Sequence, residues 1–133
     1  MAPPSAPEAP AKAERILIVE DEPAVCAVIR RTLERSHYSV SCANTAEEAL
    51  QLVESCEPFD GLLTDLRMPG MGGRELAKLL CRRFPRLKVL YVSGYPESSI
   101  AHGGVVDEGL ELLQKPFVAS ALLARLRRVL DSA

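Results

Sequence analysis

The sequence predicts a doubly wound α/β fold, in which helices cover both faces of a parallel sheet. Short, nearly continuous apolar runs alternate along the chain with segments of helical periodicity, as expected of strands buried on both faces. The chain has 133 residues, of which 47% are hydrophobic and 26% charged, and this suits one globular domain with a single core. Right-handed crossovers would join the strands into one sheet.

The strands are predicted from apolar runs that are too short for helices. They are Ile16 to Val19, Tyr38 to Cys42, Leu62 to Thr64, Val89 to Ser93 and Leu110 to Leu113. Residues 1–14 are rich in alanine and contain four of the ten prolines. Because this composition favours an extended backbone without a core, we expect a disordered linker at 1–14 and one domain at 15–133.

Helical periodicity fills the gaps between these strands. The first helix carries Val25, Val28, Ile29 and Leu33 on one face, with Pro23 in its first turn and Asp21 as a possible cap. The second opens with the capping box Thr45-Ala-Glu-Glu48. The third runs from about Gly73 to Phe84, and the last places Leu122, Leu123, Leu126, Val129 and Leu130 inward. Between Pro96 and Gly109, glycines interrupt the pattern, so any fourth helix is short or irregular.

Charge and composition exclude several classes of partner. A net charge of −2 gives no overall basic field for nucleic acid, and the arginines at 82, 83, 86, 125, 127 and 128 are predicted to be solvated helix ends. No apolar stretch is long enough for a membrane span, and no signal peptide precedes the domain, so we expect a soluble, cytoplasmic domain without membrane contact. The four cysteines have no metal-binding or redox spacing and are predicted to be buried, reduced hydrophobes.

Polar residues gather where the predicted strands end. In doubly wound sheets, ligands bind outside the carboxyl ends of the strands. The first strand is followed by Glu20-Asp21-Glu22, the third by Asp65, and the fifth by Gln114-Lys115-Pro116, while Ser93 closes the fourth. The fold therefore brings three acids, a hydroxyl and an ammonium to one edge.

This combination indicates phosphoryl chemistry with a divalent cation. Carboxylates from Glu20, Asp21 and Asp65 would repel one another unless a cation compensates them, and an all-oxygen set favours Mg²⁺, with Mn²⁺ possible. A carboxylate can itself accept a phosphoryl group, and Asp65 is the best placed to do so. Ser93 and Lys115 would then contact the phosphoryl oxygens.

Each of these residues also has an ordinary structural interpretation. The acids after the first strand could cap a helix, Lys115 could be a surface lysine, and Ser93-Gly94 could be a turn. Asp65 is harder to explain in this way, because an acid that closes a buried strand needs a partner. Only the combination favours a functional site.

Four segments of the chain resemble the phosphoacceptor receiver domains of two-component signalling: ILIVEDEP, LLTDLRMPGMGGREL, VLYVSGY and LLQKPF. The resemblance covers about Arg15 to Leu130. It implies a flavodoxin-like (βα)5 fold with strand order 2-1-3-4-5, Asp65 as phosphoacceptor, and metal ligands from Glu20, Asp21, Asp65 and the backbone carbonyl of Arg67. It also implies a cis peptide bond before Pro116. The implied partner is a histidine kinase or a histidine phosphotransfer domain, and catalysis is limited to the domain's own phosphorylation and dephosphorylation.

Two positions depart from the family pattern. Leu112 stands where these domains often carry an aromatic switch residue, so the aromatic role would be absent or taken by Tyr95. The glycine-rich stretch at 96–109 replaces the usual fourth helix. We therefore expect phosphorylation to change the order of this segment instead of shifting a rigid helix.

The sequence leaves the wider protein open. Because the chain ends at Ala133, soon after the last helix, we expect no output domain of its own. The Ala/Pro-rich leader and LLQKPF resemble receivers of hybrid sensor histidine kinases, and a stand-alone regulator is the alternative. A haloacid-dehalogenase-like phosphatase would need a second acid where Arg67 stands. A nucleotide-binding module would need a phosphate-cradling loop in place of Glu20-Asp21-Glu22-Pro23.

Overall fold

The computed structural model describes residues 13–55, 58–68, 70–94 and 111–132. Its strands are β2 (Arg15–Val19), β3 (Ser39–Ala43), β4 (Gly61–Asp65), β5 (Lys88–Ser93) and β6 (Leu112–Gln114). Its helices are α1 (Pro23–Arg35), α2 (Ala46–Ser55), α3 (Gly73–Arg83) and α5 (Ala119–Asp131). The segment at 96–109, where any fourth helix is predicted to be short or irregular, lies outside the described residues, as do Tyr95 and most of the leader.

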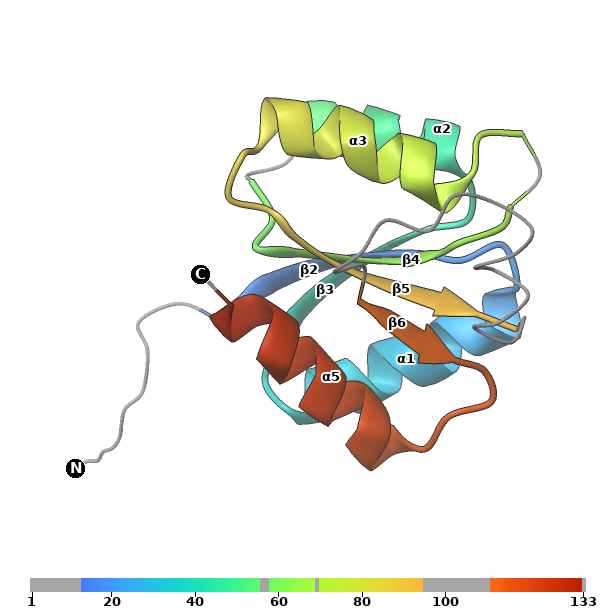
Figure 1. Ribbon diagram of the computed structural model, residues 1–133, viewed down its shortest axis with the longest axis vertical. Coiled ribbons are helices and arrows are strands. Elements are labelled where there is room, and N and C mark those ends of the chain that lie inside the picture. The colour runs from blue at the N-terminus through green and yellow to red at the C-terminus, as the bar shows by residue number, and fades with distance from the viewer. Residues whose placement is uncertain (1–12, 56–57, 69, 95–110, 133) are drawn as a thin grey trace.

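The strands form one parallel sheet in the order β3-β2-β4-β5-β6, which confirms the predicted order 2-1-3-4-5. Helices α2 and α3 cover one face of the sheet, and α1 and α5 cover the other (Figure 1). The predicted strand boundaries differ by one or two residues, most clearly at β6, which extends to Gln114. Apolarity marks buried residues, whereas a strand is bounded by its backbone pairing.

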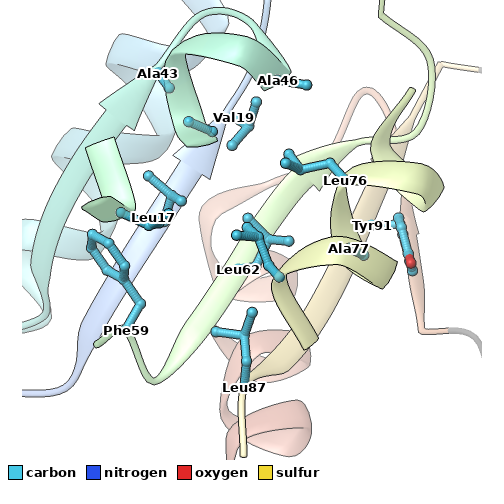
Figure 2. Packing of buried hydrophobic residues seen from close by; sticks show 13 residues of the cluster. Leu17, Val19, Ala43, Ala46, Phe59, Leu62, Leu76, Ala77, Leu87 and Tyr91 are labelled. Carbon is cyan, nitrogen blue, oxygen red and sulfur yellow. The ribbon is translucent and has the colours of Figure 1, made fainter. Parts of the chain in front are cut away.

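Alternate residues of each strand enter the two halves of the core. Leu17 and Val19 face α2 and α3, whereas Ile16 and Ile18 face α1 and α5. Figure 2 shows the first cluster, in which Leu62 of β4 lies near side chains of α3. Every residue of β4 is buried, as expected of the central strand of a sheet covered on both faces.

The ends of the helices follow from local sequence. Glu22 is the N-cap of α1 and makes no side-chain cap hydrogen bond, so the expectation that Asp21 caps this helix is wrong. Pro23 occupies the first turn, where its missing N–H is no loss. At the other end, Tyr38 N donates to Leu33 O (3.1 Å) and His37 adopts φ 74°, which together form a Schellman-type termination.

The capping box of α2 is confirmed in a modified form. Glu48 N donates to Thr45 Oγ1 at 3.0 Å, while Glu48 Oε1 accepts from the backbone N–H of Asn44 at 2.7 Å. In the usual box this carboxylate accepts from the N-cap residue itself. The first turn of α2 is therefore tied to the residue that directly follows β3.

Described cysteines are free thiols, but they are not equally buried. Cys26 is buried in the core between α1 and the sheet, and burial raises its pKa to about 12. Cys42 and Cys81 are only half-buried. Among the described helices, none is long and apolar enough to cross a membrane.

Candidate functional site

Three carboxylates meet at the carboxyl edge of the sheet. Glu20 and Asp21 follow β2, and Asp65 is the last residue of the neighbouring strand β4. One carboxylate oxygen from each of the three lies within 4.8 Å of the others. Glu20 and Asp65 are buried while Asp21 is exposed, so the cluster faces solvent on the side of Asp21. The structure thus brings together the acids that the sequence placed at one edge.

Lys115 reaches this cluster from the loop after β6. Its Nζ lies 2.9 Å from Glu20 Oε1 and donates a hydrogen bond of 3.1 Å to Asp65 Oδ2. The backbone N–H of Lys115 donates to Ser93 O at 2.6 Å, which fixes the lysine beside the end of β5. The peptide bond between Lys115 and Pro116 is cis, as the family resemblance implies.

The cluster holds more negative than positive groups, and burial makes this imbalance unfavourable. Burial raises the pKa of Glu20 to about 7, and the nearby charge of Asp65 acts in the same direction. Burial alone would lower the pKa of Lys115, but its contacts with Glu20 and Asp65 outweigh this and leave it raised. One ammonium therefore faces three carboxylates.

The donor set fits a hard divalent cation. Among the described residues, buried Glu20 Oε1 accepts no hydrogen bond, although Lys115 Nζ is close enough to form an ion pair with it. All three acids offer oxygen, which Mg²⁺ prefers, and the exposed side at Asp21 leaves room for waters. A cation here would supply the charge that the single lysine does not.

The two carboxylate oxygens of Asp65 have different partners. Oδ2 accepts from Lys115 Nζ, and Oδ1 accepts from the backbone N–H of Arg67 at 3.2 Å. The turn that begins here is closed by a hydrogen bond from Gly73 N to Leu66 O (3.0 Å). Asp65 is only 8% exposed, so its carboxylate is held in a fixed direction at the strand end.

Ser93 and Arg67 lie where the sequence places them. Ser93 is the last residue of β5 and is buried, one position beyond the Asp65–Val92 pair of the β4–β5 ladder. Arg67 follows Asp65 by two residues. The structure therefore places both residues beside the phosphoacceptor candidate, one on the neighbouring strand and one in the same loop.

Sequence reasoning missed Asn44. Its Nδ2 donates a hydrogen bond of 3.0 Å to the backbone carbonyl of Glu20. Asn44 directly follows β3, so it occupies a strand end like the other site residues. The strand-end rule would have found Asn44 if it had been applied to the second strand as well.

The chain belongs to the response regulator receiver domain family, whose model matches residues 16–127. Response regulator MprA of Mycobacterium avium is 35% identical over 116 residues, which are 87% of this chain and 50% of MprA. The C4-dicarboxylate transport transcriptional regulatory protein DctD of Pseudomonas aeruginosa is 31% identical over 128 residues, 94% of this chain and 27% of DctD. The chain thus spans half, or less, of the length of these relatives.

A solved structure with the same fold comes from another kind of protein. The receiver domain of the hybrid histidine kinase CckA is 34% identical, with a TM-score of 0.73, and the match covers 88% of this chain and 99% of that domain. The fold and the family are therefore those of a two-component receiver domain. The similar proteins include response regulators and the receiver domain of a hybrid histidine kinase.

Proposed function

We propose that this chain is a phosphoacceptor domain in which Asp65 takes a phosphoryl group from the phosphohistidine of a histidine kinase or histidine phosphotransfer domain. The observation that carries this proposal is the setting of Asp65. Its carboxylate is buried at the end of the central strand, with the Lys115 ammonium on one oxygen and two further acids beside it. Membership of the receiver family agrees with this chemistry.

The proposed transfer needs no other nucleophile. An Asp65 carboxylate oxygen attacks phosphorus, the bond between phosphorus and the donor imidazole nitrogen breaks, and that nitrogen keeps the bonding electron pair. Lys115 and Ser93 stabilise the negative charge on the phosphoryl oxygens. The displaced imidazole keeps its place on the donor protein, and an acyl phosphate remains on Asp65.

We also propose that Glu20, Asp21, Asp65 and the backbone carbonyl of Arg67 hold Mg²⁺, which Mn²⁺ can replace. When bound, the cation neutralises charge on the carboxylates and on the phosphoryl group. The support for it is the all-oxygen cluster and its single compensating lysine. Glu20 and Asp21 therefore hold the cation, while Asp65 both contacts it and accepts the phosphoryl group.

For the wider protein, we propose a receiver module of a hybrid sensor histidine kinase. The match to the CckA receiver and the Ala/Pro-rich leader, read as a linker at 1–14, support this context. The match to MprA supports the alternative, a response regulator. The coding sequence upstream of Met1 tests the choice, because the hybrid context requires an ATP-binding kinase domain there.

Replacing Asp65 by asparagine tests the phosphoacceptor assignment. With acetyl phosphate and Mg²⁺, the wild-type chain should gain the mass of one phosphoryl group, and Asp65→Asn should gain none because an amide cannot form the acyl phosphate. Intact mass spectrometry measures both. Asp60→Asn is the matched control, since Asp60 precedes the same strand at its other end and binds Arg15 N. Equal labelling of wild type and Asp65→Asn would overturn the proposal.

A further inference from the structure

The side chain of Asn44, between strand β3 and helix α2, contacts the backbone of the acidic cluster. Its Nδ2 donates to the backbone carbonyl of Glu20 at 3.0 Å. This carbonyl belongs to the peptide group that joins Glu20 to Asp21. The direction of that peptide group helps to set where each of the two acidic side chains begins.

The backbone of Glu20 is held on both sides of its Cα. Its N–H donates to Ala43 O at 3.1 Å, which continues the pairing of β2 with β3 beyond the strand. Its carbonyl is held by Asn44. Its carboxylate Oε2 accepts from the backbone N–H of Glu22 at 3.2 Å. Of the two bonds to the backbone of Glu20, the one from Asn44 comes from a side chain, so a substitution can remove it without changing any of the three acids.

Asn44 is itself held by the first turn of α2. Its backbone N–H donates to Glu48 Oε1 at 2.7 Å, and Glu48 N donates to Thr45 Oγ1 at 3.0 Å. Of these two bonds, the one to Glu48 Oε1 holds Asn44 directly and does not involve the Thr45 side chain. Asp21 most needs such support, because it is the exposed member of the cluster.

We propose that Asn44 is a positioning residue that preorganises Glu20 and Asp21 for the divalent cation by holding the peptide group between them. This inference rests on the proposed function, because it assumes that the acidic cluster binds the cation. Asn44 contributes no ligand. It lowers the conformational freedom that the two acids would otherwise lose on binding the metal.

Metal affinity measured without phosphorylation tests the role of Asn44. Free Mn²⁺ is counted by electron paramagnetic resonance during titration of the wild type, Asn44→Ala and Thr45→Ala. Asn44→Ala should raise the dissociation constant about fivefold, as expected when one hydrogen bond is lost. Thr45→Ala removes the N-cap of α2 but leaves the bond to Glu20, so it should lower the melting temperature and leave the dissociation constant within about twofold of the wild type.

A second readout separates positioning from general destabilisation. In acetyl phosphate labelling, Asn44→Ala should raise the Mg²⁺ concentration for half-maximal rate about fivefold and change the rate at saturating Mg²⁺ by less than about twofold. Equal Mn²⁺ affinity of Asn44→Ala and wild type would overturn the inference and leave the proposed function intact. Equal weakening by Asn44→Ala and Thr45→Ala would also overturn it. If the wild type bound no Mn²⁺, the inference and the metal site would both be wrong.

Discussion

Glu20 is a carboxylic acid with no exposed surface, and it lies beside a second buried carboxylate. Burial disfavours its ionised form, and the charge of Asp65 disfavours it further, so the pKa of Glu20 rises to about 7. Lys115 offsets only part of this effect. The buried negative charge at this sheet edge therefore lowers stability, and the cation proposed above would compensate it.

Replacing Glu20 by glutamine should separate stability from metal binding. At pH 8 without metal, Glu20→Gln should be more stable to urea by roughly 1 kcal/mol, because one buried negative charge is removed next to Asp65. The wild type should gain about 1.4 kcal/mol when Mg²⁺ is present at ten times its dissociation constant. Most of that gain should be lost in the variant. Metal-free stability below that of the wild type would contradict the argument, as would an undiminished gain with Mg²⁺.

The positions of site residues could be predicted to different degrees. Glu20, Asp65 and Lys115 were found because each lies at the carboxyl end of a strand, and a parallel sheet places such residues at one edge. Asn44 also lies at a strand end, but it was missed because the rule was not applied to the second strand, and its hydrogen bond to a backbone carbonyl cannot be deduced from residue type. Asp21 was considered as a helix cap as well as a metal ligand, because an acid before a helix fits both roles, but the N-cap of α1 is Glu22.

At the scale of elements, the turn from β4 to α3 places the backbone of Asp65 against the start of a helix. Gly73 is the first residue of α3, and a Cβ added there would lie 2.1 Å from the carbonyl oxygen of Asp65. Thr64 Oγ1 would also be close, at 3.1 Å. The absence of a side chain at residue 73 therefore allows α3 to begin directly beside the end of β4.

Gly73→Ala should destabilise the domain by about 3 kcal/mol, because the new methyl group meets backbone that cannot move without disturbing β4. Gly72→Ala is the matched control. The backbone of Gly72 has an ordinary φ of −80°, and a Cβ there would lie 3.4 Å from Leu66 O. The control should stay within about 0.5 kcal/mol of the wild type in urea denaturation. Similar losses in both variants would show that the close approach at residue 73 is not the cause.

The order of the elements could be predicted from periodicity, but their ends could not be placed to the residue. The apolar run was predicted to end at Leu113, whereas the ladder with β5 continues to Gln114, a polar residue that pairs with Ser93. The C-terminus of α1 depends on a positive φ at His37. Glycine at this position would have predicted that conformation, but histidine does not. These differences come from backbone hydrogen bonding, which side-chain polarity reports only indirectly.

For the molecule as a whole, one arginine joins the beginning of the fold to its last helix. Arg127 of α5 donates to both carboxylate oxygens of Glu14 (2.7 and 2.9 Å) and to Asp131 (2.8 and 3.1 Å), and it contacts Tyr38 Oη at 3.3 Å. Glu14 also accepts a backbone hydrogen bond from Ser39 at 2.9 Å. The residue just before β2 is thus fixed to both β3 and α5, and Arg127 is not the freely solvated arginine that the charge pattern predicted.

Arg127→Ala should therefore destabilise the domain by about 1 kcal/mol, more than an isolated surface ion pair, because it removes a bidentate contact and a network with two acids. The side chains of Arg127 and Glu14 are 45% and 38% exposed, so solvent screens the interaction and limits the effect. Arg128→Ala is the control: that arginine is 70% exposed and lies 3.8 Å from Glu111, so its loss should cost about 0.3 kcal/mol or less.

Urea denaturation in low salt and in 1 M NaCl measures both variants. The gap between them should narrow in high salt, because screening weakens the wild-type network. Equal free energies of unfolding for Arg127→Ala and Arg128→Ala at low salt would mean that the first residues of the fold are held by the β2–β3 pairing alone.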